Sequence, residues 1–559
     1  MSDTANGANA AADLPKSPYG IPIYRMVWSA NLVSNFGTVL QAVGASWIMV
    51  SLSGSATLVA LVQASTTLPI MLLSLVTGAV ADSFDRRKIM LGAQTLMLCA
   101  ASLLSVCALL GLLTPWMLLG FTFLIGCGTA FNAPAWQASV GEMVPRPLLS
   151  SAIAYNSMSF NIARAVGPAI GGAIVAAAGA ASAFCVNAVS YLGLIAVLLR
   201  WKREPQEGGL PRERLGSAIG AGVRYVLMSP SLKTILARAG AFGLFSSSIS
   251  ALMPLVAHDL LGGGPLTYGL LLGAFGLGAV VAALTIKRIR ARFSTEAIVR
   301  GASIAFLGGA VGAGLSPSMF LTMPVLALAG GGWVLALSTF NASIQLGSPR
   351  WVVARAVSLY QMVTFGGMAA GSWAFGALAE ANSVRFALIM AGCGQALVFG
   401  IGLIRKLPDM GGDNLDLLNR WREPETMVPI EPRSGPIVIT IDYRVAPANW
   451  QRFMDVMAER RRIRIRDGAR RWRLLQDLND DTIWIERYQV PTWLDYVRHN
   501  QRRTHADMAN LEALRALLIE GQRPVVRQKI ERHPGATYPH RVEPMDEMTP
   551  SLIDPARYA

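Results

Sequence analysis

Charged residues are scarce in this chain. Asp, Glu, Lys and Arg make up 15% of its 559 residues, whereas soluble domains average about 25%. Hydrophobic residues make up 53%, and the mean hydropathy is +0.42. Low charge combined with long apolar runs is typical of a polytopic membrane protein. The formal net charge of +15 does not indicate a nucleic-acid partner, because the Lys and Arg residues lie in short loops and in a polar C-terminal part.

Cysteine is also rare, and its distribution indicates neither a metal site nor a disulfide framework. All five cysteines lie in apolar runs: Cys99, Cys107, Cys127, Cys185 and Cys393. None has the spacing of metal ligands. The chain also lacks a Gly-x-x-x-x-Gly-Lys-Ser/Thr motif, so we do not expect ATP to drive it. We therefore expect no metal and no cofactor.

The first 20 residues lack an apolar core, which argues against a cleavable signal peptide. We expect residues 1–22 to form a disordered cytoplasmic N-terminus. Twelve apolar stretches follow between residues 27 and 405, each long enough to cross about 30 Å of hydrocarbon. The fifth and sixth are predicted at about 151–178 and 182–201.

The charges of the connecting loops support an even number of spans. One set of loops is basic, as at 86–88 and 287–292, whereas the alternate loops, such as 53–54 and 316–317, are nearly uncharged. The positive-inside rule then places both termini in the cytoplasm. An error of one helix would destroy this alternation.

The twelve predicted helices divide into two related halves of six. Pro145 and Arg146, which precede the fifth span, align with Pro349 and Arg350 before the eleventh. A duplicated six-helix unit is typical of transporters that place the substrate near the midplane, between the repeats. The predicted parts are an N-terminal bundle at 23–201, a cytoplasmic linker with an amphipathic helix at 202–232, and a C-terminal bundle at 233–405.

The composition changes after residue 405, and a small soluble domain is predicted there. Alternation of Ile437, Ile439, Ile441 and Tyr443 indicates a half-buried strand. The order β-α-β-β-α-β predicts a cytoplasmic α+β domain of the ferredoxin-like type. The expected parts are a linker at 406–435, the ferredoxin-like domain at 436–535 and a disordered tail at 536–559.

Polar side chains inside the spans are the candidate substrate-binding residues, because they are costly in hydrocarbon and usually face the interior. Arg164 lies about 22 Å along the fifth span, at 1.5 Å per residue. It either binds an anionic group of a substrate or serves a structural role by bonding helix carbonyls. The polar candidates that accompany it, each of which could equally join helices, are Asn35, Gln41, Asn156 and Asn187. No Asp or Glu lies near the middle of a predicted span, so the coupling mechanism stays open.

A dense cluster of charge follows Gly78 in the sequence Gly-Ala-Val-Ala-Asp-Ser-Phe-Asp-Arg-Arg-Lys. As a basic turn between two spans it could serve only to orient the chain. Its spacing resembles the loop signature between the second and third helices of the major facilitator superfamily. Ser83 and Asp85 depart from that pattern. The resemblance implies a conformational role for Gly78, Asp82, Arg86 and Arg87.

A second motif lies in the predicted fifth span. Gly167, Pro168, Gly171 and Gly172 form a Gly-Pro-x-x-Gly-Gly element, in which proline permits bending and glycines permit close packing. Ordinary packing of small residues would also produce it. The element resembles the fifth-helix signature of drug and metabolite exporters of the superfamily, with Ala163 where the first glycine is usual.

Together these features resemble the enterobactin-exporter-like, or transmembrane secretion effector, branch of the superfamily. The resemblance covers about residues 20–535. It implies a twelve-helix fold and export of a siderophore, drug or related metabolite across the bacterial inner membrane by alternating access. Proton coupling is expected. The implied partners are a small-molecule substrate and the lipid bilayer, with dimerisation through the C-terminal domain.

A second hypothesis concerns the C-terminal domain, which also resembles the α+β barrel of small monooxygenases. It could be a tethered enzyme or a sensor fused to a transporter scaffold. His499 and His505 are its acid-base candidates. Neither lies in a recognisable catalytic pattern, and both are interpreted as surface histidines on a basic helix. We therefore expect a regulatory or dimerising module rather than an enzyme.

Overall fold

The computed structural model describes residues 17–201, 215–408 and 423–532, together with Leu415, Leu418 and Trp421. These residues fall into two compact units. The bundle unit comprises the described residues of Met1–Pro205, Thr234–Ala342 and Ser358–Pro408, and the tail unit those of Gln206–Lys233, Ser343–Val357 and Asp409–Ala559. Most of the predicted N-terminus at 1–22, parts of both linkers and all of the predicted tail at 536–559 lie outside the described residues.

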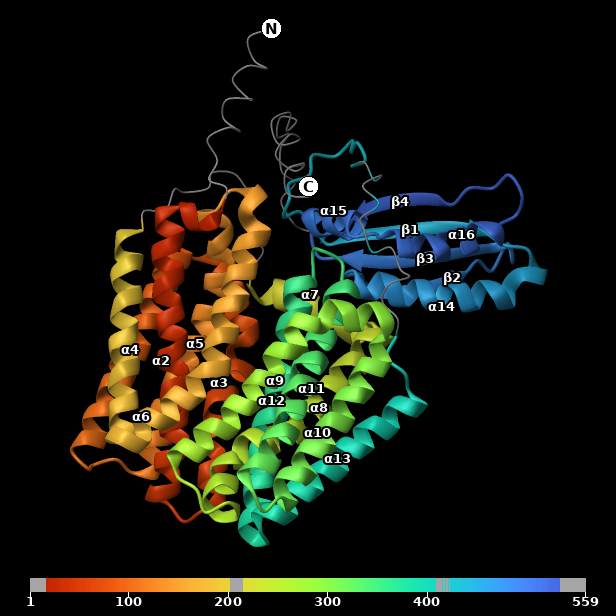
Figure 1. Cartoon of the computed structure of the whole chain (residues 1–559). Coiled ribbons are helices and arrows are strands. Elements are labelled where there is room, and N and C mark those ends of the chain that lie inside the picture. Colours follow the sequence, from red (N-terminus) through yellow and green to blue (C-terminus); the bar gives the residue numbers. More distant parts are fainter. Residues whose placement is uncertain are drawn as a thin grey trace. The chain divides into compact units, whose positions relative to one another are not determined.

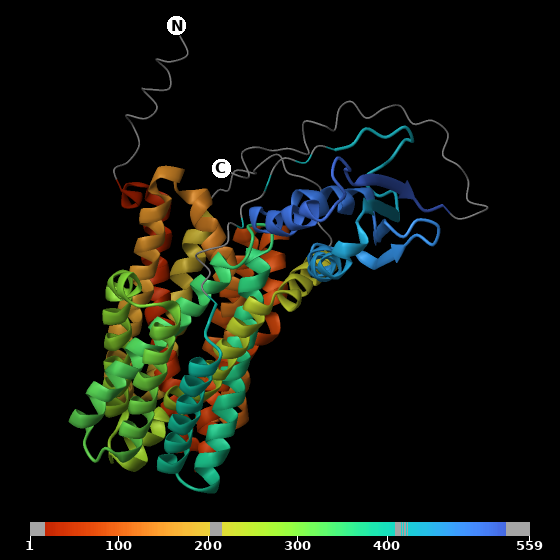
Figure 2. The same ribbon diagram turned by 90° about the vertical axis from the view of Figure 1, so that its right-hand side faces the viewer.

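Eleven helices within the described ranges are long and apolar enough to cross a membrane. They are α2 (Pro22–Leu52), α3 (Ala56–Ser83), α4 (Arg86–Leu109), α5 (Pro115–Met143), α6 (Leu149–Arg200), α8 (Pro230–Leu255), α9 (Pro265–Arg292), α10 (Thr295–Leu315), α11 (Met319–Leu346), α12 (Val353–Ala381) and α13 (Val384–Ile404). In the bundle unit, α2–α6 form one group and α8–α13 a second group beside it (Figure 1), and Figure 2 shows the second group in front of the first. These groups are the two halves of the bundle.

Helix α6 contains both the fifth and the sixth predicted span. Its 52 residues would extend about 78 Å at 1.5 Å per residue, more than twice the thickness of the hydrocarbon core. The backbone is interrupted at Gly179, where φ is 78° and ψ is 168°. Glycine tolerates this conformation because it has no Cβ.

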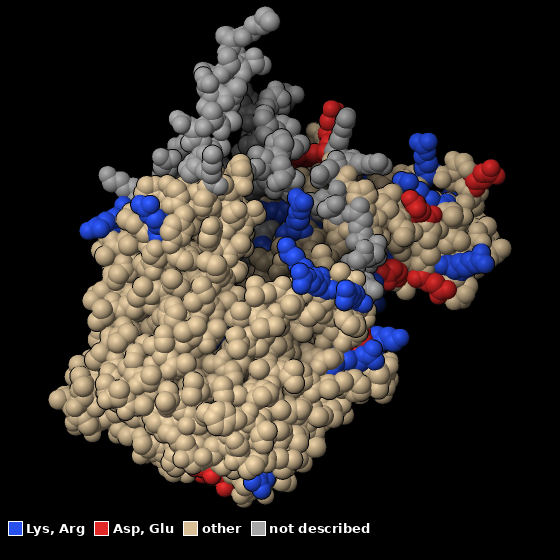
Figure 3. Space-filling model, in the orientation of Figure 1, with Lys and Arg blue, Asp and Glu red and all other residues tan. Residues whose placement is uncertain are grey.

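The ends of the helices follow from local chemistry. Ser55, Thr114, Ser294 and Ser383 each accept a backbone N–H through the side-chain oxygen and so begin α3, α5, α10 and α13. The flank of the bundle unit between these ends carries uncharged side chains in the view of Figure 3. Many of them are large and exposed, such as Leu284 and Phe320, as expected of a surface in contact with lipid.

The tail unit contains a four-stranded antiparallel sheet and its helices. The elements are α7 (Leu215–Met228), β1 (Ile437–Arg444), α14 (Trp450–Arg466), β2 (Arg470–Gln476), β3 (Ile483–Val490), α15 (Trp493–Gln501), α16 (Met508–Ala516) and β4 (Val525–Ile530). The strand order is β2-β3-β1-β4, and every neighbouring pair is antiparallel. Figure 1 shows these strands in that order.

The core of this sheet lies on one face and follows the alternation of β1. Ile437, Ile439, Ile441 and Tyr443 are all buried, as the alternation predicted. Their partners on β3 are Val490, Tyr488, Glu486 and Trp484. These residues pack with Phe453 and Met457 of α14 and with Tyr496 and Val497 of α15 in one hydrophobic cluster. A carboxylate, that of Glu486, therefore lies within an otherwise apolar layer.

Candidate functional site

Arg164 on α6 lies over the indole ring of Trp333 on α11. The guanidinium carbon is 3.9 Å from the ring centre. This contact joins the two halves of the bundle, because α6 belongs to the first group of helices and α11 to the second. No ion pair joins Arg164 to a carboxylate in the described part of the chain. Among the described contacts of Arg164, its positive charge lies against an aromatic ring, whose face attracts cations.

The backbone around Arg164 touches α9 directly. A Cβ added to Gly276 would lie 2.5 Å from the carbonyl oxygen of Arg164, and one added to Gly269 would lie 2.5 Å from that of Pro168. A Cβ on Gly172 would lie 2.6 Å from the carbonyl oxygen of Pro265. Real Cβ atoms do not approach other atoms so closely, so the α6–α9 crossing has room for glycine alone.

Gly167 and Gly171 face a different helix from Gly172. Cβ atoms at these two positions would meet Val39 at 2.9 Å and Leu40 at 3.3 Å, both on α2. The Gly-Pro-x-x-Gly-Gly element therefore packs within the first half through two of its glycines and against the second half through the third.

A second helix pair, α3 and α12, also joins the halves. A Cβ on Gly376 would lie 2.6 Å from Ala60, and one on Gly366 would lie 2.8 Å from the sulfur of Met71. Gly78, from the charged loop motif, faces the hydroxyl of Ser358 at 3.3 Å by the same measure. The two helices thus approach each other at both ends and in the middle.

Glu380 connects these helices at the end of the bundle where α2 ends and α3 begins. Its carboxylate accepts hydrogen bonds from the Ser55 hydroxyl at 2.5 Å and from the Thr57 backbone N–H at 2.9 Å. A carboxylate at a helix N-terminus is favoured by the positive end of the helix dipole. At the same end, Trp47 of α2 lies edge-on to His258 and stacks on Tyr268 of α9. Both contacts join the two halves.

The two arginines of the charged motif bind other helices of the first half. Arg86 donates to the Glu142 carboxylate at 2.7 Å and to the Ala138 carbonyl at 3.0 Å, both on α5. Arg87 donates to the carbonyls of Leu198 and Leu199 at the end of α6. Cations at a helix C-terminus satisfy its free carbonyls and its dipole. Asp82 lies in α3, and its side chain is outside the described part of the structure.

The predicted polar residues separate into two groups. Asn187 donates to Gln41 and to the Tyr191 hydroxyl, and the three side chains are buried between α2 and α6. Asn35 donates to Ser159 at 3.3 Å and so also joins α2 to α6, whereas the buried Oδ1 atom of Asn156 has no hydrogen-bond partner among the described residues. Asn156 therefore retains hydrogen-bonding capacity.

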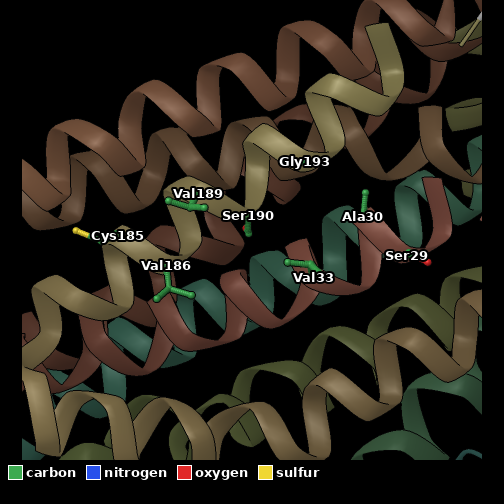
Figure 4. Close-up of a pocket in the computed structure, with 8 residues that line it drawn as sticks. All are labelled: Ser29, Ala30, Val33, Cys185, Val186, Val189, Ser190 and Gly193. Atoms are coloured by element: carbon green, nitrogen blue, oxygen red, sulfur yellow. The ribbon is translucent and has the colours of Figure 1, made fainter. Parts of the chain in front are cut away.

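A groove of about 550 Å³ lies between α2 and the second part of α6 (Figure 4). Its lining residues are Ser29, Ala30, Val33, Cys185, Val186, Val189, Ser190 and Gly193. Val33 is 56% exposed and Val189 65% exposed, so the groove opens on the outer surface of the unit. None of the five predicted substrate-binding residues lines it, and its apolar walls are suited to acyl chains.

The tail unit contains a buried polar network that the sequence analysis missed. Glu486 binds Arg460 at 2.9 Å and Arg464 at 3.0 Å and accepts from the hydroxyl of Tyr443 at 2.6 Å. Arg464 also contacts Nε2 of His499 at 3.1 Å. The alternation Trp484-Glu486-Tyr488 contains the signal that places Glu486 on the buried face.

The prediction that His499 is a surface residue is wrong, because this side chain is only 1% exposed; His505 is exposed. Burial and the neighbouring Arg464 hold the pKa of His499 well below its usual range. Arginine can only donate, so Nε2 accepts and the Nδ1–H points to the carbonyl of Asp467. The ring has no nitrogen left for acid-base exchange. Among the described residues, no cluster of His, Cys, Asp and Glu could hold a metal.

Comparison with known proteins gives a consistent result. The model of the family described as "Transmembrane secretion effector" matches residues 14–534. The enterobactin exporter EntS of Salmonella typhimurium is 27% identical over 344 residues, which cover 58% of this chain and 80% of that protein. The multidrug efflux pump Tap of Mycolicibacterium fortuitum is 24% identical over 375 residues, 64% of this chain and 90% of the pump.

Solved structures agree at the level of the fold. The nucleoside transporter NupG aligns with a TM-score of 0.54 at 10% identity and covers 68% of this chain and 98% of that chain. A bacterial homologue of the human lysosomal transporter Spinster, inward-facing and unoccupied, aligns with a TM-score of 0.55 at 14% identity, over 70% and 96% of the two chains.

Proposed function

The chain belongs to the transmembrane secretion effector family of major facilitator transporters, and from this membership we propose that it exports a small anionic molecule across the bacterial inner membrane. It is a membrane transporter and not an enzyme. The substrate class is a siderophore, a drug or a related metabolite that carries an anionic group. Alternating access moves this substrate past a site between the halves.

The contact between Arg164 and Trp333 carries the substrate proposal. It places a cation and an aromatic face where the two halves meet, and no described carboxylate pairs with Arg164. A desolvated guanidinium attracts an anionic ligand more strongly than one in water. We assign substrate binding to Arg164, Asn35 and Asn156, with Gln41 and Asn187 holding the neighbouring helices in place.

The proposed moving parts are the two helix pairs that join the halves, α6–α9 and α3–α12. Gly167, Pro168, Gly171 and Gly172 permit α6 to bend and slide against its neighbours. In the charged motif, Gly78 permits the approach of α12. Arg86 and Arg87 hold α4 to α5 and α6. Asp82 acts as a gate at the end of α3.

The proposed topology has twelve spans with both termini in the cytoplasm, since α6 accounts for two of them across Gly179. We propose that the chain is divided into the parts 1–22, 23–201, 202–232, 233–405, 406–435, 436–535 and 536–559. The sheet order and the helices of 436–535 support a ferredoxin-like domain, through which the protein dimerises. The proton gradient drives export. A monooxygenase-like role of this domain is not favoured, because His499 is buried and engaged.

The test is extrusion of a panel of siderophores, macrolides and dyes from cells that lack their own pumps. Arg164→Ala should lower extrusion of the anionic compounds about tenfold, as the loss of one desolvated cationic contact implies. Arg164→Lys should retain part of it, because it keeps the charge but not the planar stack on Trp333. Asn161→Ala is the matched control, because Asn161 lies on the same helix and its described hydrogen bond goes to the Ser157 carbonyl, one turn earlier on that helix.

Two results would count against the proposal. Equal extrusion of anionic compounds by the wild type and Arg164→Ala, at matched amounts in the membrane, would contradict the proposed anion site. A wild-type protein that extrudes none of the compounds would contradict the proposed export.

A further inference from the structure

Four side chains of the tail unit form a continuous stack of rings and guanidinium groups. Arg466 lies over the ring of Tyr225, with its guanidinium carbon 5.2 Å from the ring centre. Tyr225 meets Trp351 edge-to-face, with ring centres 5.5 Å apart and an interplanar angle of 86°. Arg502 lies over Trp351 at 4.1 Å. We call these four residues the stacking ladder.

The ladder brings together three distant parts of the sequence. Arg466 ends α14 and Arg502 follows α15, so both belong to the sheet domain. Tyr225 belongs to α7, which lies between the two halves of the bundle in the sequence, and Trp351 belongs to the connection between α11 and α12. The sheet domain therefore contacts two segments, α7 and the α11–α12 connection, that are continuous in sequence with the membrane helices.

Arg466 is held rigidly in its place in the ladder. Its guanidinium binds the carboxylate of Asp467 at 2.9 Å and that of Asp507 at 2.9 Å. Asp507 is fixed in turn, because it forms a capping box with Thr504. Tyr225 is only 3% exposed. A preorganised cation over a buried ring is a stronger contact than the same pair on a mobile surface.

Close contacts along α7 reinforce the ladder. A Cβ added to Gly222 would lie 2.5 Å from Cβ of Arg355, in the first turn of α12, so the side chain of Arg355 packs directly on the α7 backbone. On its other side, α7 packs against the end of α14, where Arg224 lies 3.4 Å from the Cβ position of Gly468. Helix α7 is thus held between the start of α12 and the sheet domain.

We propose that the sheet domain is an intramolecular brake on transport, with the stacking ladder as its contact. Tyr225 is followed by α8 within five residues, and Trp351 precedes α12 by two. A movement of α8 relative to α12 therefore strains the ladder unless it opens. Opening exposes the buried ring of Tyr225 and the half-buried ring of Trp351 and separates two cations from them, so the ladder slows the conformational step. This inference rests on the proposed transport function for its effect on rate, but not for the contact itself.

The experiment compares the full-length wild type with Arg502→Gln and Trp351→Leu in nanodiscs. The first measurement is amide hydrogen exchange in α7, which requires no substrate. Both variants should exchange about tenfold faster in α7, as the loss of a half-buried cation–π contact implies. Tyr225→Phe keeps the ring and should behave as the wild type. Arg473→Gln, an exposed arginine on β2 outside the ladder, is the matched control.

The second measurement is the rate of extrusion by the same variants. We expect the maximal rate to rise about threefold in Arg502→Gln and Trp351→Leu, with the KM for the substrate unchanged. Unchanged exchange in α7 would overturn the ladder as a contact. Faster exchange with an unchanged or lower maximal rate would overturn the brake. If the wild type extrudes nothing, export itself fails, whereas the exchange data still decide whether the ladder holds α7.

Discussion

Glu486 is a buried carboxylate whose charge is opposed by burial and favoured by its hydrogen-bond partners. It is 0% exposed and binds two arginines, a tyrosine hydroxyl and the indole N–H of Trp472. Burial alone would raise the pKa of Glu486, but the guanidinium groups of Arg464 and Arg460 and the Tyr443 hydroxyl hold it well below its usual range. The carboxylate therefore stays charged because its partners are also buried.

This arrangement predicts a stability that depends on acid pH. The pKa of Glu486 in the folded chain lies below the unfolded value of about 4.3. Its contribution is therefore fully present above about pH 5 and is lost as the pH falls below that value. Glu486→Gln should destabilise the tail unit by about 3–5 kcal/mol at pH 7, because two buried arginines lose their carboxylate. Thermal melts followed by tryptophan fluorescence would measure both effects.

Asp442→Asn is the control for that prediction. Asp442 lies on the neighbouring strand and pairs with Arg527, whose side chain is 58% exposed. Exposed pairs contribute little, so the melting temperature should change slightly. Equal destabilisation by the two variants, or a full acid dependence in Glu486→Gln, would contradict the assigned role of the buried carboxylate.

Some of the candidate site residues could be predicted from the sequence, but their partners could not. Arg164 was found because an arginine deep in an apolar run is unusual, but its partner Trp333 was not, since no local pattern relates residues on helices of different halves. His499 was misjudged for a different reason. Its burial depends on which side of α15 faces the sheet. His499 follows Tyr496 by three residues and so lies on the face that packs in the hydrophobic cluster, a spacing that the interpretation as a surface residue left out.

Between helices, glycine residues determine how closely two of them can approach. Where α6 crosses α9, backbone atoms meet backbone atoms at Gly172, Gly269 and Gly276. Close approach of this kind replaces the hydrophobic effect as the force between helices in lipid. It also leaves a smooth surface, along which one helix can shift against another without interlocked side chains.

A matched pair of substitutions on α6 tests this geometry. Gly172→Ala should lower both transport and thermal stability, because its Cβ would lie 2.6 Å from the carbonyl oxygen of Pro265. Gly193→Ala should be neutral or slightly stabilising, since nothing lies within 4 Å of that position and alanine favours a helix by about 0.5–1 kcal/mol. Extrusion assays and melting temperatures of purified protein would compare them. Equal behaviour of both variants would show that the crossing tolerates a side chain.

Elements themselves were well predicted where hydropathy is the signal. The apolar runs located ten of the spans one by one, and the fifth and sixth fall in the single helix α6. The reason for the merger is local: alanines and small residues on both sides of Gly179 favour helix, and only one residue leaves the helical region. The gap between the two predicted spans, at 179–181, contains Gly179, the residue that leaves the helical region.

At the scale of the whole transporting region, the two halves meet through contacts of different kinds. The α6–α9 and α3–α12 pairs pass through the bundle, whereas Glu380 and Trp47 act at the end where α3 begins. Alternating access requires one end to separate while the other closes. Polar and aromatic contacts at an end are therefore the ones expected to break during the cycle.

A reversible cross-link between Thr57 and Glu380 tests whether this end opens. Thr57 donates its backbone N–H to the Glu380 carboxylate at 2.9 Å, so cysteines at both positions lie within reach of a short, reducible bis-methanethiosulfonate linker. Linking the Thr57→Cys, Glu380→Cys double variant should abolish extrusion, and a reductant should restore it, because transport needs the two helices to part. Each single variant, treated with the same reagent, controls for the native cysteines. Continued extrusion by fully cross-linked protein would mean that α3 and α12 stay together here, and the opening would then have to occur between α6 and α9 alone.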